Sequence, residues 1–245
     1  MIAASHFVGF LLAAAGATIV LATGQGTWAS ALVGFVVACL LVLGFGVPVM
    51  APLSTFVLGS GILTRLGRTI KERFRSAEAN RGRRSVSQVL AKLGIPALLG
   101  LVAALAGDDE GRLAIGAAAS MAGAFADTTA TEVGPLAQGP VVRWRGLRLE
   151  RSSHGSVGGM SVAGLAAGAG ASALVAVVAL AVGLVRSPAA AGIVALAGLV
   201  AAGIESGIAA TPVGIRLGHG GRNVFVSATA AAAGIVAAVI RGGIR

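Results

Sequence analysis

Charged side chains are scarce in this 245-residue sequence. They make up only 11% of the residues, while 56% are hydrophobic and the mean hydropathy is +0.90. Soluble proteins carry about 25% charged residues, so this composition excludes a water-soluble or disordered chain. Cysteine is almost absent too. Cys39 stands alone in an apolar run, which excludes a disulfide framework and a cysteine-based metal site.

Tyrosine is missing and aromatic residues reach only 4%, whereas glycine contributes 38 residues. Glycine and alanine dominate long stretches such as 163–181. Small residues let helices approach closely in lipid, although a GC-rich genome would produce the same bias. Both explanations remain open from composition alone.

The hydropathy pattern predicts an all-α, polytopic transmembrane helix bundle with about eight spans (six to nine), forming one transmembrane domain over 1–245. The expected segments are 7–21, 29–43, 49–63, 86–105, 113–126, 157–185, 189–208 and 224–240. Three of them are short for a full crossing. The fifth segment stands out because it stops at a carboxylate.

Basic residues gather on alternate connections. The stretches 65–84, 143–151 and 216–222 hold 8, 4 and 2 of them, or 14 of the 19 in the chain. The positive-inside rule makes these connections cytoplasmic and both termini extracytoplasmic. We therefore expect a basic cytoplasmic loop over 65–84, a cytoplasmic loop with an acidic motif over 127–156, and an active face toward the cytoplasm. The membrane is expected to be the inner or plasma membrane of a prokaryote. The net charge of +10 then points to membrane lipids or an anionic substrate, not to nucleic acid.

Three of the nine acidic residues lie within or beside apolar segments. Asp127 and Glu132 follow the fifth segment, and Glu205 lies inside the seventh. A carboxylate within a span costs about 2.5–3.5 kcal/mol, so it indicates a function. On a regular helix, Asp127 and Glu132 diverge by about 140°. They share one site only if the helix unwinds before Gly134; otherwise they have separate roles, cap the helix end or pair with arginines.

Candidate phosphate ligands surround these acids. Thr131 and Thr128 lie one helical turn from Asp127 and Glu132. The stretch 152–161 is rich in glycine and serine, and free N–H groups of such a loop attract phosphate. The expected phosphate-binding set is Arg81, Arg83, Arg84, Gln88, Thr128, Thr131, His154, Gly155, Ser156, Gly158, Gly159 and Asn223.

Several of these candidates have a second explanation. His154 is either a base, a phosphate ligand or a loop histidine without a role. The arginines either form bidentate contacts with phosphate or only anchor the loop at the membrane. Lys92 follows Gln88 at i, i+4 and either faces the same site or extends to the membrane surface. Carboxylates and phosphates together are the usual ligands of Mg²⁺, so the sequence predicts Mg²⁺ held by Asp127, Glu132 and Glu205.

Four motifs resemble one known family of integral membrane proteins. They are Gly-Arg-Arg-Ser-Val-Ser-Gln-Val-Leu-Ala (82–91), Ala-Asp-Thr-Thr-Ala-Thr-Glu-Val-Gly (126–134), Gly-Ser-Val-Gly-Gly-Met-Ser (155–161) and Glu-Ser-Gly-Ile-Ala-Ala-Thr (205–211). The family includes the plant phytyl-phosphate kinase of tocopherol synthesis and uncharacterised archaeal and bacterial relatives. It is distantly similar to dolichol and phytol kinases and to phosphatidate cytidylyltransferases. In three places the sequence departs from the family: Val157 and Lys92 replace asparagines, and Glu205 replaces an aspartate.

The resemblance implies a kinase that transfers a phosphoryl group from CTP or ATP to a prenyl or phytyl monophosphate. Asp127, Glu132 and Glu205 would be its catalytic residues. A cytidylyltransferase-type lipid enzyme and an ion-coupled transporter are the alternatives. The expected partners are the lipid phosphate, the nucleotide and membrane lipids; the sequence leaves a homodimer open.

Overall fold

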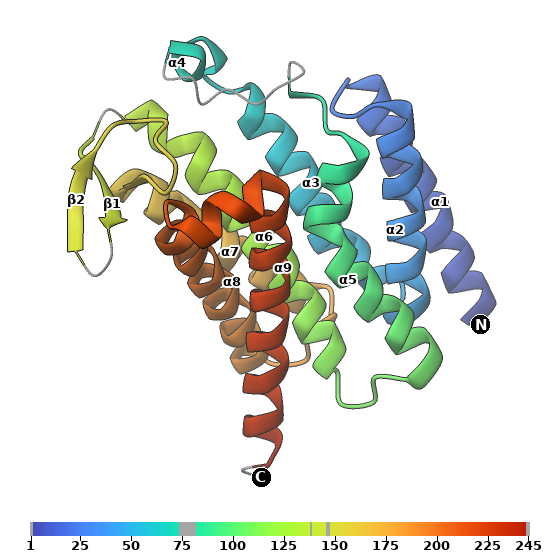
Figure 1. The fold of residues 1–245 in the computed structure, drawn as a ribbon. Coiled ribbons are helices and arrows are strands. Elements are labelled where there is room, and N and C mark those ends of the chain that lie inside the picture. Colours follow the sequence, from blue (N-terminus) through green and yellow to red (C-terminus); the bar gives the residue numbers. More distant parts are fainter. Residues whose placement is uncertain (1, 74–81, 138, 146–147, 244–245) are drawn as a thin grey trace.

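The computed structural model describes residues 2–73, 82–137, 139–145 and 148–243. Eight long helices make up most of this part (Figure 1): α1 (Ile2–Ala22), α2 (Trp28–Phe45), α3 (Met50–Arg65), α5 (Val86–Ala106), α6 (Arg112–Val133), α7 (Val162–Ala181), α8 (Pro188–Ala209) and α9 (Pro212–Gly243). Seven of them are long and apolar enough to cross a membrane by themselves. The remaining long helix, α6, does not qualify by its own composition. The predicted all-α bundle of about eight spans is confirmed.

The bundle has two different ends. Figure 1 shows the short helix α4 (Arg68–Arg73) and a small sheet at one end, and both chain termini at the other. The connections that were expected to share one side, between α3 and α5 and between α6 and α7, lie together at the first end. The structure therefore agrees with the predicted grouping of the basic connections, while the identity of the cytoplasmic end stays a prediction.

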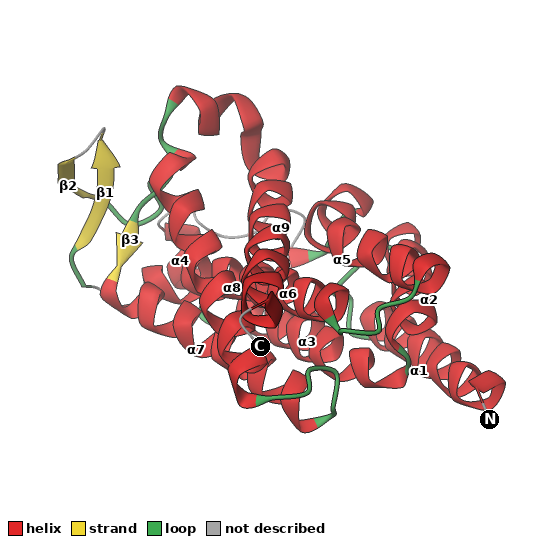
Figure 2. Ribbon diagram, turned by 90° about the horizontal axis from the view of Figure 1, so that it is seen from below, coloured by secondary structure: helices red, strands yellow, loops and turns green. Residues whose placement is uncertain are grey.

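A three-stranded sheet was not expected from the sequence. Strands β1 (Val141–Arg145), β2 (Arg148–Ser152) and β3 (Met160–Ser161) form an antiparallel sheet in the order β2-β1-β3. Figure 2 shows it beside the helices, outside the bundle. A sheet with strands this short leaves no hydropathy signal, because apolar and polar residues alternate over too few positions to be distinguished from a loop.

Two helix boundaries differ from the expectation and change the geometry of the site. Helix α6 continues to Val133 instead of ending at Ala126, so Asp127 and Glu132 are helical and not in a loop. The 3₁₀ turn η3 (Gly134–Ala137) follows directly. Helix α7 begins at Val162 instead of Val157. Gly158 has a φ of +73°, a left-handed conformation that interrupts a helix and favours glycine.

Small residues set the distances between helices. A Cβ added to Gly44 of α2 would lie 2.1 Å from the carbonyl oxygen of Gly100 on α5, and one added to Gly198 of α8 would lie 2.8 Å from the backbone nitrogen of Gly123 on α6. Each pair lets two backbones touch. Helix α6 is the centre of the bundle, since residues 114–126 are all buried and it packs on α3, α5, α7, α8 and α9.

Pro96 explains another contact between helices. Proline has no backbone N–H, so Pro96 leaves the carbonyl oxygen of Lys92 without its helical partner. The Ser227 hydroxyl of α9 donates a hydrogen bond to that oxygen at 2.8 Å, and Ser120 of α6 lies 2.7 Å from the same hydroxyl. This buried pair of serines joins α5, α6 and α9 close to Lys92.

Candidate functional site

A polar pocket of about 240 Å³ lies between the ends of α6 and α8, the middle part of α9 and the loop before β3. Its lining includes two carboxylates, two histidines, an arginine and an amide, in a protein that has few such groups. They are Asp127, Glu205, His154, His219, Arg222 and Asn223. The pocket therefore brings acidic, basic and amide side chains from four parts of the chain together.

Asp127 enters the pocket from α6 and is held from behind by Lys92. The Lys92 ammonium lies 3.3 Å from Asp127 Oδ2 and donates a 2.6 Å hydrogen bond to the Thr128 hydroxyl. Both charged side chains are largely buried, with 8% of Lys92 and 17% of Asp127 exposed. Asp127 Oδ1 makes no hydrogen bond with the described residues. One carboxylate oxygen thus lies beside a cation, and the side chain lines the pocket.

Glu205 enters from α8 and is placed in the same way. Its Oε1 lies 3.1 Å from Arg222 Nε, and its side chain lines the same pocket as Asp127. The Arg222 Nε–H does not point at Oε1, so this contact is an ion pair without a hydrogen bond. Asp127 and Glu205 therefore face one pocket, each beside a cation: Lys92 lies outside the pocket lining and Arg222 belongs to it.

A break in α9 brings Arg222 and Asn223 to this place. Gly218 has φ +63° and ψ −177° and separates a short first part of the helix from its long second part. Residues 219–223 form the first turn of the long part, whose N–H groups and dipole attract anions. Arg222 Nε and Asn223 Nδ2 are buried donors without an acceptor among the described residues. Leaving such a donor unsatisfied costs about 1–3 kcal/mol, which an anionic ligand would remove.

The glycine-rich loop closes the pocket from the side of the sheet. It runs from β2 to β3 and lines the pocket with His154 to Ser161. A Cβ at Gly158 would lie 2.9 Å from the carbonyl oxygen of Ser206 on α8, so glycine is needed there for both φ and space. The Ser156 hydroxyl lies 2.7 Å from that of Ser152. Val157, which replaces the family asparagine, is half-exposed and also lines the pocket.

Glu132 belongs to a different cluster. Its Oε1 accepts a 2.7 Å hydrogen bond from Thr64, and its Oε2 lies 2.5 Å from the ammonium of Lys71 on α4. Lys71 is fully buried and also donates to the carbonyl oxygen of Leu63 at 2.6 Å. Arg84 donates to the Thr64 hydroxyl at 3.1 Å. Because α6 stays regular past Thr129, Glu132 faces away from Asp127, as the angle between them requires.

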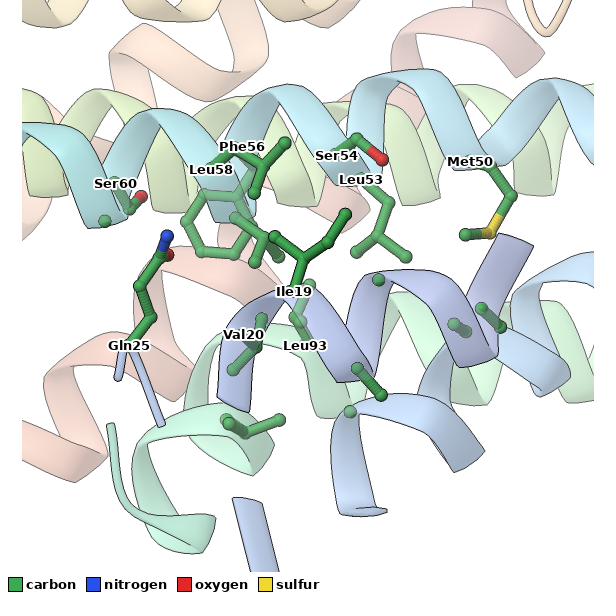
Figure 3. A pocket seen from close by; sticks show the side chains of 18 of the residues that line it. Ile19, Val20, Gln25, Met50, Leu53, Ser54, Phe56, Leu58, Ser60 and Leu93 are labelled. Carbon is green, nitrogen blue, oxygen red and sulfur yellow. The ribbon is translucent and has the colours of Figure 1, made fainter. Parts of the chain in front are cut away.

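A second, larger cavity of about 710 Å³ is lined mainly by α1, α2, α3 and α5. Its walls are aliphatic over most of their length. Figure 3 shows Gln25 and Ser60 at one end and Met50 at the other, with Ile19, Leu53 and Phe56 between them. Arg84, Gln88 and Lys92 also line this cavity. We call it the apolar cavity below.

The two cavities meet at one side chain. Lys92 lines the apolar cavity, and its ammonium contacts Asp127, which lines the polar pocket. Gln88 lies one helical turn away on the same helix, where its side-chain Oε1 accepts a hydrogen bond from the Ser85 N–H in a capping box. The backbone of Arg84 is pinned by a 2.8 Å hydrogen bond from its N–H to Gln25 O.

The residues expected from the sequence thus fall into groups. Brought together at the polar pocket are Asp127, Thr131, His154, Gly155, Ser156, Gly158, Gly159, Glu205 and Asn223. Arg84 and Gln88 line the apolar cavity. Thr128 lies between them as a partner of Lys92. Glu132 lies apart, Arg83 is exposed, and Arg81 is outside the described residues.

Four polar lining residues lie outside the expected set: Ser161, Ser206, His219 and Arg222. Arg222 was counted only as a loop charge, and His219 was not considered. The signal that would have found His219 and Arg222 is Gly-His-Gly-Gly-Arg-Asn at 218–223, where a glycine breaks a helix directly before polar residues, as in the loop at 152–161.

A three-carboxylate metal site is not formed. Among the described residues, no three His, Cys, Asp or Glu side chains gather closely enough to hold an ion by themselves. Asp127 and Glu205 still suit Mg²⁺, because this ion is usually bound by one or two carboxylates together with substrate phosphates. Among the described residues, the cations contact Asp127 through Oδ2 and Glu205 through Oε1.

Comparisons with known proteins place the chain in a family. The family described as Integral membrane protein DUF92 matches residues 7–213. No curated protein and no solved structure matches the chain.

Proposed function

The chain belongs to the DUF92 family of integral membrane proteins, and on this premise we propose that it is a membrane-embedded, nucleotide-dependent kinase of a prenyl or phytyl monophosphate. The observation that carries the proposal is the contact between Lys92 and Asp127, because it joins a cavity suited to an apolar chain with a pocket suited to phosphates. A kinase for a lipid phosphate needs both of these environments side by side.

The polar pocket supports binding of the triphosphate of CTP or ATP. Arg222 and Asn223 supply buried donors that lack an acceptor within the described part of the chain, the second part of α9 adds its helix N-terminus, and the loop with Gly158 lets the backbone come close to phosphate oxygens. Asp127 and Glu205 would hold Mg²⁺ against those oxygens. When bound, this ion neutralises charge that develops on the transferred phosphoryl group.

The reaction then requires little covalent chemistry from the protein. An oxygen of the lipid phosphate attacks the γ-phosphorus of the nucleotide and forms a new P–O bond. The bond between the γ-phosphorus and the β–γ bridging oxygen breaks, and the nucleoside diphosphate leaves with that electron pair. The acceptor phosphate is already ionised, so no general base is needed, and catalysis is mostly positioning and charge stabilisation. Lys92 holds Asp127 in place and contributes positive charge where the two substrates meet.

The test is the substitution Asp127→Asn in purified protein, with Asp109→Asn in the exposed loop between α5 and α6 as its matched control. We expect Asp127→Asn to lower transfer of labelled γ-phosphate to phytyl monophosphate about a hundredfold or more, with membrane insertion unchanged. The control should keep full activity. Unchanged turnover in Asp127→Asn would overturn the proposal, and release of pyrophosphate in place of a nucleoside diphosphate would assign nucleotidyl transfer instead.

A further inference from the structure

The apolar cavity has the dimensions of a binding site for a lipid chain. Along α3 its lining extends from Met50 to Gly61, or about 16 Å at about 1.5 Å per residue. This is about half of the roughly 30 Å hydrocarbon thickness of a bilayer. A volume of about 710 Å³ also lies within the range of about 300–1,000 Å³ that encloses a single ligand.

The charged and amide side chains of this cavity are confined to one end. Gln25, Arg84 and Gln88 lie where α1 and α2 meet and where α5 begins, and Lys92 follows one turn further along α5. Apart from the hydroxyls of Ser30, Ser54 and Ser60, the remaining lining is apolar down to Met50 at the opposite end (Figure 3). Two cations at the mouth of an apolar cavity complement a ligand that has an anionic head and a long apolar tail.

The cavity owes its width to residues without side chains. Gly16 of α1 and Gly34 of α2 both line it, and a Cβ added to either would meet no atom within 4 Å. Gly34 lies six residues from Trp28, the first residue of α2, which is about 9 Å from the polar end. Helix α1 covers the cavity with the smallest buried share of any span, 11%, so few contacts between helices narrow it.

We infer that the apolar cavity holds the single long chain of the acceptor lipid, with its phosphate at Arg84, Gln88 and Lys92, and that Gly16 and Gly34 set the chain length that is accepted. This inference rests on the proposed function and extends it: the lipid approaches Lys92 from one side and the nucleotide approaches Asp127 from the other. The two substrates then do not compete for space, and both are bound when the phosphoryl group moves.

The experiment compares Gly34→Leu with the matched control Gly94→Leu. Gly94 is also half-buried in a span and has open space around its Cα, but it does not line the cavity. Binding is measured with geranyl and geranylgeranyl monophosphate, and a photoreactive geranylgeranyl monophosphate is crosslinked and its attachment sites are mapped by mass spectrometry.

We expect Gly34→Leu to weaken binding of the geranylgeranyl compound about tenfold or more, because most of its chain loses apolar contact, and to change binding of the geranyl compound less than about twofold. Gly94→Leu should change neither. Crosslinks should fall on α1, α2, α3 and α5. Equal losses with both chain lengths, crosslinks on other helices, or equally strong competition by a two-chain phosphatidate would each overturn the inference.

Binding and transfer separate this inference from the proposed function. If the long-chain phosphate binds in the cavity with the expected dependence on residue 34 but no nucleotide phosphorylates it, the inference stands and the kinase proposal fails. If transfer is observed and Gly34→Leu behaves like Gly94→Leu with both lipids, the kinase proposal stands and the inference fails.

Discussion

The buried pair of Lys71 and Glu132 provides a sharp test of how the carboxylates divide their roles. The sequence suggested Glu132 as a catalytic and metal-binding residue, whereas the structure places it 2.5 Å from the Lys71 ammonium with both side chains almost fully buried. Lys71 also donates to the carbonyl oxygens of Leu63 and Thr64, in the last turn of α3. If this cluster fixes α4 onto the bundle, its removal should reduce stability more than catalysis.

The expected costs follow from what each substitution leaves behind. Lys71→Met leaves a buried carboxylate whose remaining hydrogen-bond partner among the described residues is the Thr64 hydroxyl, and an uncompensated buried charge costs about 3–5 kcal/mol. Glu132→Gln leaves the ammonium with the Leu63 and Thr64 carbonyl oxygens, so its cost should be about 1–3 kcal/mol. The double variant buries no unpaired charge. Its loss of unfolding free energy should be smaller than the sum of the losses in the two single variants, by a coupling energy of about 1–3 kcal/mol.

The assay is unfolding of the purified proteins in mixed detergent micelles by SDS titration, with transfer activity measured per folded molecule. Glu132→Gln should keep its turnover within a few-fold of the unaltered protein. Additive destabilisation would refute the coupling. A Glu132→Gln variant of normal stability but without turnover would show that Glu132 takes part in the reaction. That result would refute the assignment of Glu132 to stability and of Asp127 to catalysis.

Two further predictions concern the bundle itself. Ser227→Ala should lower the free energy of unfolding by about 1–3 kcal/mol, because it leaves the Lys92 carbonyl oxygen unsatisfied. This loss should be smaller in a Pro96→Ala background, where a backbone N–H is restored near that oxygen. Equal losses with and without the proline, measured by the same SDS titration, would contradict this role of Ser227. In a Cys39→Ala background, cysteines at the exposed positions Arg83 and Asp109 should react with an impermeant maleimide from opposite faces of sealed vesicles. Labelling of both from one face would exclude the eight-span topology.

The spans were predictable because each is a long apolar run, and hydropathy reports directly on the cost of placing a segment in lipid. Their order and the alternation of basic connections followed from the same signal. The resemblance is confirmed at the level of an integral membrane protein family, while the kinase activity stays a prediction. The sheet around Trp144 was not predicted, since five-residue strands next to arginines resemble any polar connection.

The site was predictable where function depends on unusual residue types in an apolar context. Asp127, Glu205 and the glycine-rich loop were found in this way and do line one pocket. What could not be predicted is which cation contacts which acid. Lys71, Lys92 and Arg222 are far in sequence from Glu132, Asp127 and Glu205, and only the packing of α4, α5 and α9 against α6 and α8 pairs them.

Helix α6 has a consequence for how the protein is made. Within the described chain it is the one long helix that does not qualify as a span by its own composition, because its surface is covered by other helices and need not be soluble in lipid. A segment of this kind gains little from entering the bilayer alone. We expect its insertion during synthesis to depend on helices that follow it, so that a chain released from the ribosome before α7–α9 would leave Asp127 outside the membrane.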